Sequence, residues 1–554
     1  MMKAKFHILS AALVASASLC AAAAANPSAL GRRWVHLQCD LSNDAGFDKA
    51  TNIVSTAAAH GYTGVMFASS SKLSTLHLWG DESKARLARI KALCDAKGLE
   101  TGVVMWSCGY PKDSFFAIDP NLSAANPVFG TRYRVEKDRC VHVATPPREL
   151  VASRAQVHAP RRDGDFRSID VPVTPRRSYR LTLRATAEGG GSTWPIALAV
   201  RHPGTTGDWI EHRAHWIKTD GKERPYTLDF SSMELDKVTV CCFEYNKNLP
   251  GHVEIASLSL EEMPPIVVVR RHGTPIAVRH AKTGETFEEG IDYAPVPKAK
   301  DVWPGDWIPA ERRFAVKPLP GGRMKEGDEI VVDCYAPFPV WGKWQGACMA
   351  AKEMDDILDA SAAAVQKAIA PSVWLLGLDE VRTGGGCEDC RAIGDMAHIY
   401  AAFVKKCRAA VRKRSSKAEV YLWNDMVDPY CMSDKTGEGR YAALYSSMKG
   451  VWDLLPRDLG IACWRVDSRE KGLPFFAERG HPVMIGAYYD ANNLDSSVEW
   501  AKVALDTPGV KGGIMYCTWC DKWDLLGAFG DEMKRLSGLR SDAENSIIPN
   551  RLAK

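Results

Sequence analysis

The chain has 554 residues, a formal net charge of +4 and 25% charged residues. At roughly 100–200 residues per domain, this length predicts two to four domains. The small charge is not gathered into one basic block, so nucleic acid is not expected as a partner. After the N-terminus, no stretch approaches the roughly 20 apolar residues that a membrane-spanning helix needs, so no membrane span is expected.

The first 25 residues are built like a secretory signal peptide. Lys3 and Lys5 precede an uncharged, alanine-rich run from Phe6 to Ala25. We predict cleavage after Ala25, which makes the mature chain a secreted or periplasmic protein. A lipoprotein anchor on Cys20 is disfavoured, because Leu19 before it is too bulky for the usual lipobox.

Residues 26–132 alternate between short apolar segments and amphipathic ones. The apolar segments 34–41, 64–68 and 101–106 predict strands, and 48–60 and 82–97 predict helices. Such alternation is typical of parallel strands covered by helices. This segment is therefore expected to be the first part of a (β/α) barrel.

Residues 133–263 change to short segments of two-residue periodicity, such as 179–184 and 196–200, broken by glycine and proline. This pattern predicts an inserted, jelly-roll-like β-sandwich. Its last segment, 252–260, resembles the final strand of many carbohydrate-binding modules. Two roles stay open for this domain, because it could bind glycan or only brace the barrel.

The remaining chain is expected to be a β-rich connector (264–327), the rest of the catalytic barrel (328–540) and a tail (541–554). Its predicted helices are 353–370 and 394–413, and its predicted strands are 329–335, 372–378, 419–425, 461–465, 483–489 and 513–518. These make nine candidate strands for eight places, so one strand flanking the insertion is expected outside the barrel. The predicted fold class is α/β, a (β/α)8 TIM barrel with an inserted β-sandwich.

Acidic and aromatic residues follow the predicted barrel strands. In such a barrel the carboxyl ends of the strands meet at one face and carry the site. Acids there suit glycoside hydrolysis, in which one carboxylic acid protonates the leaving oxygen and another group stabilises the anomeric centre. Aromatic rings suit the apolar faces of sugars. The residues in question include Asp40, Asp379, Glu380, Trp423, Asp425, Trp464, Tyr488, Tyr489, Asp490 and Trp519.

The cysteines give a weaker signal. Without Cys20 the chain has 15 of them, among which Cys387 and Cys390 form a single C-x-x-C after the acid pair and Cys407 lies on the next predicted helix. A closed zinc site needs four ligands, and the sequence has no second matched pair. A structural role or a local disulfide is favoured over metal binding, and no metal is expected.

The run from Leu375 to Val381, which contains Gly377 and Asp379-Glu380, resembles family-20 glycoside hydrolases, the β-N-acetylhexosaminidases. The sequence is also similar to family-20-like secreted proteins of the Lentisphaerae and Planctomycetes. It departs from the family-20 pattern at Leu376 and Leu378, which puts the sugar specificity in doubt. The shared elements are Asp379-Glu380-Val381-Arg382, Cys387-x-x-Cys390, Trp423-x-Asp425-Met426-x-Asp428-Pro429, Gly486-x-Tyr488-Tyr489-Asp490 and Met515-Tyr516-x-Thr518-Trp519.

This resemblance implies retaining hydrolysis assisted by the substrate. Glu380 would act as acid and base, Asp379 would orient the 2-acetamido group, and either Tyr488 or Tyr489 would bind its oxygen. No metal or organic cofactor is needed, and the expected partner is a glycan or oligosaccharide. The resemblance further suggests Trp423, Trp464 and Trp519 as walls around the sugar, and Asp40, Arg382, Asp425 and Asp490 as ligands of its hydroxyls.

Two alternatives stay open. The protein could hydrolyse another sugar, using Glu380 with Asp425 or Asp490 as a conventional carboxylate pair. It could also be a glycan-binding barrel without catalysis.

Overall fold

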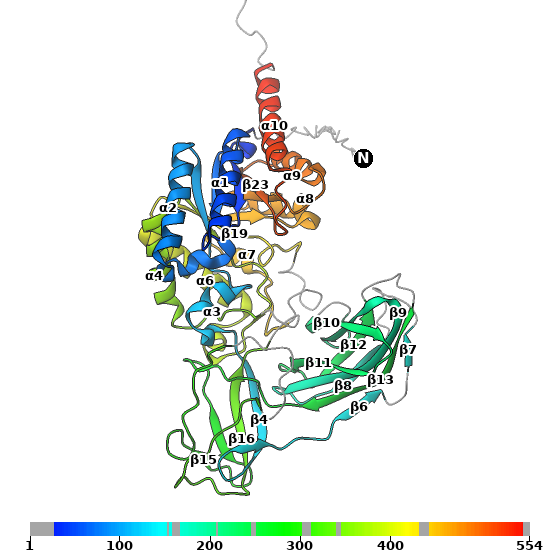
Figure 1. Cartoon of the computed structure of the whole chain (residues 1–554). Coiled ribbons are helices and arrows are strands. Elements are labelled where there is room, and N and C mark those ends of the chain that lie inside the picture. Colours follow the sequence, from blue (N-terminus) through cyan, green and yellow to red (C-terminus); the bar gives the residue numbers. More distant parts are fainter. Residues whose placement is uncertain are drawn as a thin grey trace, which may run out of the picture.

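The computed structural model describes residues 27–151, 155–157, 167–205, 209–244, 251–301, 312–338, 345–431 and 443–546. The predicted signal peptide and the end of the predicted tail lie outside these ranges. Within them, no helix has both the length and the apolar character needed to cross a membrane. Figure 1 shows a barrel surrounded by helices, a smaller antiparallel sheet next to it, and a larger antiparallel domain to one side.

Eight parallel strands form a closed barrel in the order β1-β2-β3-β17-β19-β21-β22-β23. The ring closes between its first and last strands, where Val35 pairs with Tyr516. Because all eight strands run in one direction, their carboxyl ends lie at one rim. The strands are β1 (Arg33–Leu37), β2 (Gly64–Phe67), β3 (Glu100–Met105), β17 (Val373–Leu376), β19 (Glu419–Trp423), β21 (Gly460–Cys463), β22 (Val483–Tyr488) and β23 (Val510–Cys517).

Large side chains fill the barrel interior, and glycines on neighbouring strands make room for them. Trp34 and Tyr421 belong to this interior cluster. A Cβ at Gly64 would lie 2.5 Å from the Trp34 ring, and a Cβ at Gly460 would lie 2.3 Å from the Tyr421 ring. Trp34 Nε1 donates a hydrogen bond to the carbonyl of Gly512 at 3.0 Å. The interior is thus a packed core and not a channel.

Helices cover the outside of the barrel. Two of them begin at side chains that accept a backbone N–H: Asn43 from Gly46 in α1, and Asp395 from His398 in α6. The main helices are α1 (Asp44–Ala59), α2 (Asp81–Ala96), α4 (Met354–Ala368), α6 (Met396–Arg414), α8 (Arg469–Glu478), α9 (Asp495–Asp506) and α10 (Leu526–Ser546). Three shorter ones are α3 (Phe115–Ile118), α5 (Glu388–Ile393) and α7 (Val451–Leu454).

The predicted fold class, α/β with a (β/α)8 barrel, is wrong. The eight parallel strands close, but the helices are too few for that class. The only α-helix between β19 and β21 in the described chain is the four-residue α7. Sheets of eight, five and two further strands stand beside the barrel, so strands dominate the described chain. The sequence prediction extended the alternation of strand and helix from residues 26–132 to residues 328–540, where the alternation is incomplete.

A five-stranded sheet joins the barrel to the insertion. Its order is β15-β14-β16-β4-β5, so strands from before and after the insertion pair directly. The ninth candidate barrel strand lies here, as β16, and not in the barrel. The strands are β4 (Asn126–Val135), β5 (Cys140–His142), β14 (Ala277–His280), β15 (Thr286–Phe287) and β16 (Glu329–Ala336). The two-stranded sheet pairs β18 (Thr383–Gly384) with β20 (Ala443–Leu444).

The insertion has the two layers of a β-sandwich, joined by the long strand β9 (Ser178–Arg201). The first half of β9 pairs with β11 and β13, and its second half pairs with β10 and β12. Leu181 and Ile196, one from each half, are buried in the same cluster. The remaining strands are β6 (Arg148–Val151), β7 (Ala155–Val157), β8 (Arg167–Pro172), β10 (Trp209–Asp220), β11 (Arg224–Ser231), β12 (Lys237–Glu244) and β13 (Gly251–Glu262).

The packing of Gly460 against Tyr421 gives a test of the barrel core. Gly460→Ala should lower the free energy of unfolding by about 1–3 kcal/mol, because the added methyl group overlaps an aromatic ring held inside the barrel. Gly80→Ala is the control, since a Cβ there would meet nothing within 4 Å. Urea denaturation measures both. Equal midpoints for the two variants would contradict the packing described.

Candidate functional site

A cavity of about 530 Å³ opens at the rim formed by the carboxyl ends of the barrel strands. Its volume lies in the range of small-molecule sites. The lining combines acids at the floor with aromatic rings on the walls. It comprises His36, Gln38, Ala68, Val104, Ser107, Tyr110, Pro111, Lys112, Asp113, Gln345, Gly377, Asp379, Glu380, Trp423, Trp464, Tyr489 and Trp519.

Aromatic side chains from three strand ends form one wall. The rings of Trp464 and Tyr489 are stacked, with centroids 5.5 Å apart and planes 13° from parallel. Trp519 meets Tyr489 edge to face at 6.3 Å. Tyr489 is 48% exposed and Trp519 is 42% exposed. Large rings with this exposure beside a cavity are suited to contact a ligand.

The backbone that carries Tyr489 is strained. Tyr488, Tyr489 and Asp490 have φ values of 73°, 51° and 59°, a region that side-chain-bearing residues rarely adopt. The Asp490 carboxylate accepts a hydrogen bond from the backbone N–H of Trp519 at 2.8 Å and another from Cys520 at 3.1 Å. These contacts tie the end of β22 to the end of β23. Asp490 therefore positions the aromatic wall.

A half-buried carboxyl, Asp379, and a fully buried one, Asp425, lie together beneath this wall. Burial, followed by the charges of Asp425 and Glu380, raises the pKa of Asp379 to about 8. Burial also raises the pKa of Asp425 to about 6. Asp425 accepts hydrogen bonds from the Glu380 backbone N–H at 2.8 Å and from Trp464 Nε1 at 3.4 Å. Both carboxyls therefore keep a proton to higher pH than an exposed carboxyl does.

Glu380 is held by two further side chains. Its Oε2 accepts hydrogen bonds from Tyr110 Oη and from Arg382 Nη2. Arg382 Nη2 also donates to Tyr110 Oη at 2.8 Å, and the guanidinium lies 4.9 Å from the centre of the Tyr110 ring. The backbone of Glu380 is in the left-handed region, with φ 48°. A Cβ at Gly109 would lie 2.2 Å from the carbonyl oxygen of Asp379, so the loop that carries Tyr110 closes tightly on the acid pair.

His36 lines the cavity, and one of its ring nitrogens is buried. It is 1% exposed, and its Nδ1 meets no partner among the described residues. Burial lowers its pKa to about 3, so the ring is neutral. It contacts Trp519 edge to face at 5.0 Å. A neutral imidazole that lines a cavity is suited to exchange a hydrogen bond with a polar group of a ligand.

The structure brings together six of the predicted site residues at the cavity: Asp379, Glu380, Trp423, Trp464, Tyr489 and Trp519. Asp425 and Arg382 are buried just behind them and contact Glu380.

Three predicted ligands of the sugar do not line the cavity. Asp40 is exposed, and its carboxylate accepts from the Ser42 backbone N–H at 3.0 Å. Tyr488 is buried and stacked on Tyr516, with centroids 4.2 Å apart. Asp490 positions the neighbouring loops, as described above.

Several lining residues were missed by the sequence prediction. His36 lies within β1 and not after it, and it points inward because side chains alternate along a strand. Tyr110 comes from the segment after β3, and Gln345 from the segment after β16. The strand pattern signals His36, whereas nothing local in the sequence marks Tyr110 or Gln345.

No family model and no curated protein matches the sequence. Among solved structures, the chain is similar to a CBM4 module, with 9% identity over 21% of this chain and 78% of that chain and a TM-score of 0.17. It is similar to the C-terminal domain of EclA, a sugar-binding protein, with 14% identity over 22% and 80% of the two chains and a TM-score of 0.15. It is also similar to the CBM22-1 xylan-binding domain of Paenibacillus barcinonensis Xyn10C, with 10% identity over 25% and 96% and a TM-score of 0.14.

The raised pKa of Asp379 predicts a pH-dependent cost to stability. A carboxyl whose pKa is higher in the folded chain stabilises the fold fully below its unfolded pKa of about 4 and ceases to do so as pH rises through about 8. Asp379→Asn should therefore raise the melting temperature by a few degrees at pH 8.5 and leave it unchanged at pH 4. The exposed Asp453→Asn is the control, and calorimetry at both pH values measures the difference. An equal effect of Asp379→Asn at the two pH values would show that the raised pKa of Asp379 does not cause the change in stability.

Proposed function

We propose that the cavity at the barrel mouth binds a sugar residue of a glycan. The observation that carries this proposal is a wall of partly exposed aromatic rings over a floor of carboxyls in one cavity. Aromatic faces suit the apolar C–H faces of a pyranose ring, and carboxylates and a neutral histidine suit its hydroxyls. His36, which is neutral and lines the cavity, can exchange a hydrogen bond with such a hydroxyl.

The finer proposal is that the site hydrolyses a β-N-acetylhexosaminide in the way the family-20 resemblance implies. Glu380 gives a proton to the glycosidic oxygen as the bond from that oxygen to C1 breaks. The acetamido oxygen of the substrate bonds to C1 and forms an oxazolinium ion, whose N–H is held by the Asp379 carboxylate. Glu380 then takes a proton from water, and that water attacks C1 and restores the acetamido group.

Three features of the site support this finer proposal. Asp379 and Glu380 both line the cavity, so neighbouring acids can serve different atoms of one substrate. Of the two neighbouring tyrosines, Tyr489 lines the cavity and Tyr488 does not, which makes Tyr489 the candidate of that pair for the acetamido oxygen. An N–H donor from the substrate also offsets the burial that raises the pKa of Asp379, because a hydrogen bond to a carboxylate favours its charged form.

A second candidate function is glycan binding without catalysis. The observation that favours it is the contact of Glu380 Oε2 with both Arg382 and Tyr110. A carboxylate oxygen that already accepts from two donors is suited to hold its position, and less suited to deliver a proton. The two candidates differ in turnover, which a panel of chromogenic glycosides measures.

Hydrolysis predicts different defects at the two neighbouring acids. Glu380→Gln should reduce kcat most on substrates with poor leaving groups, because an activated aryl group departs with little protonation. Asp379→Asn should slow even activated substrates by about 100-fold to 1000-fold, because the oxazolinium ion loses its anionic partner. Steady-state kinetics on N-acetylglucosaminides and N-acetylgalactosaminides measure both.

The control is Glu478→Gln, at an exposed position of α8, which should leave the kinetics unchanged. A 2-hydroxy glycoside should be a very poor substrate, and a thiazoline mimic of the cyclic intermediate should inhibit strongly. Cleavage of the 2-hydroxy sugar as fast as the acetamido sugar would exclude assistance by the substrate. Binding across the panel without turnover would replace hydrolysis with the second candidate.

Trp519 tests the sugar-binding wall separately from the chemistry. Trp519→Ala should weaken binding of a sugar or of the thiazoline inhibitor about 10-fold, the equivalent of about 1.4 kcal/mol, because one stacking face is lost. Trp216→Ala is the matched control, since Trp216 is an exposed tryptophan of the sandwich. Calorimetric titration measures the affinity, and the melting temperature reports on the fold. Unchanged affinity in Trp519→Ala would remove this ring from the site.

A further inference from the structure

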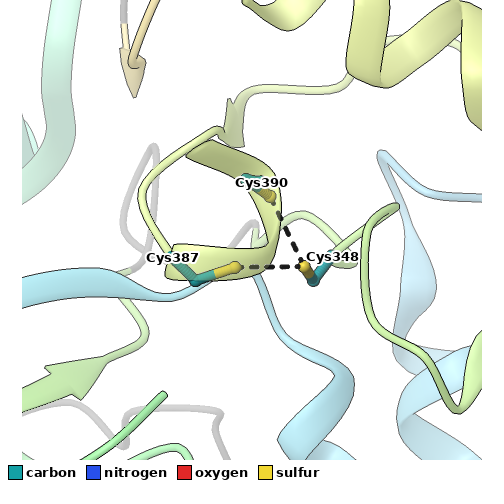
Figure 2. Close-up of side chains that lie close together, drawn as sticks. All are labelled: Cys348, Cys387 and Cys390. Carbon is teal, nitrogen blue, oxygen red and sulfur yellow. Dashed lines mark hydrogen bonds between the residues drawn. The ribbon is translucent and has the colours of Figure 1, made fainter. Parts of the chain in front are cut away.

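Three cysteines from two distant segments meet in the core beside the barrel. Cys348 Sγ lies 3.7 Å from Cys387 Sγ and 3.7 Å from Cys390 Sγ. Figure 2 shows Cys390 on α5 and Cys387 just before its first residue, both facing Cys348 on the loop opposite. All three are at most 3% exposed. Their sulfur atoms lie within 4.8 Å of one another, the closeness required of ligands to a single metal ion.

We propose that Cys348, Cys387 and Cys390 bind one zinc ion. Two thiolates at the usual Zn–S distance of about 2.3 Å and at the tetrahedral angle lie about 3.8 Å apart, which matches the two separations of 3.7 Å. A disulfide would need about 2.05 Å between two of these sulfurs and would leave the third outside the bond. Compact sites rich in thiolate ligands favour zinc among the common divalent ions.

Arg271 supplies the charge that such a site needs. Its Nη1 and Nη2 each donate to Cys387 Sγ at 3.6 Å, and its side chain is 1% exposed. Three thiolates and one divalent ion carry one net negative charge. Arg271, which also pairs with Asp389 at 3.9 Å, lies beside that charge and lowers the electrostatic cost of burying it. Donors to ligand sulfur are also the usual outer contacts of zinc sites. The fourth tetrahedral position is left for a small ligand such as water.

The ion would have a structural role, distinct from the acids at the barrel mouth. Cys348 follows the cavity residue Gln345 by three positions, and the backbone N–H of Gly346 between them donates to Thr383 Oγ1 at 2.9 Å. On the other side, Arg391 of α5 forms an ion pair with Glu234 of the sandwich at 2.8 Å. Zinc would therefore fix one wall of the cavity at the point where the barrel, connector and sandwich meet.

Metal analysis of the full chain, purified without chelators, tests the proposal. We expect about one zinc per chain in the wild type and less than about a tenth of that in Cys387→Ser/Cys390→Ser. Cys463→Ser is the control, because it removes a buried cysteine from a barrel strand outside this cluster. Removing zinc with a chelator should lower the melting temperature of the wild type and leave that of the double variant unchanged.

Cobalt exchange of the wild type gives a readout that does not depend on the variant folding. We expect the intense visible bands of tetrahedral Co²⁺ and a thiolate charge-transfer band in the near ultraviolet. A wild-type chain without metal would overturn the proposal, as would a disulfide among the three cysteines found by mass spectrometry. Full zinc content in a folded double variant would place the ion elsewhere and also overturn it.

Discussion

Closure of eight parallel strands into a ring is the constraint on which the candidate site depends. It places the residues that follow β17, β19, β21, β22 and β23 around one opening, although they are spread over more than a hundred positions of sequence. The backbone N–H and C=O groups of the strands form their hydrogen bonds within the ring. This rigid ring can hold the residues at the strand ends in strained backbone conformations. Glu380 and Tyr489 both have such a conformation, with φ values of 48° and 51°.

Much of the site could be predicted because residues after parallel strands share an edge. That rule places Asp379, Trp464 and Trp519 at the cavity. It fails where the chain turns away at once: Asp40 stays in the turn after β1 and binds the Ser42 backbone. The rule also cannot find Tyr110, which lies five residues beyond the end of β3, or Gln345, which follows β16, a strand outside the barrel. The fold class was wrong because alternation clear in the first hundred residues does not continue with a full set of helices.

The site concentrates electrostatic cost in a small volume. Three carboxyls converge at the floor, and Glu380 is paired with a cation, Arg382. The remaining two, Asp379 and Asp425, keep a proton to higher pH than exposed carboxyls do. If the site had no function, replacing one of these two aspartates with an apolar residue would raise the free energy of unfolding, because like charges in a buried site repel each other. In the cysteine cluster, by contrast, the guanidinium of Arg271 places a positive charge next to the sulfur of Cys387.

The position of the insertion also sets the order in which the chain can fold. Ser372, which precedes β17, donates a hydrogen bond to Glu100 of β3, 272 residues earlier. At roughly 5–20 residues per second, a ribosome needs roughly 15–50 s after β3 to synthesise β17, the strand that pairs with it. The sandwich is continuous in sequence and can fold within that interval. The exposed edges of β1, β2 and β3 must meanwhile avoid pairing with other chains, a period in which chaperones have most to contribute.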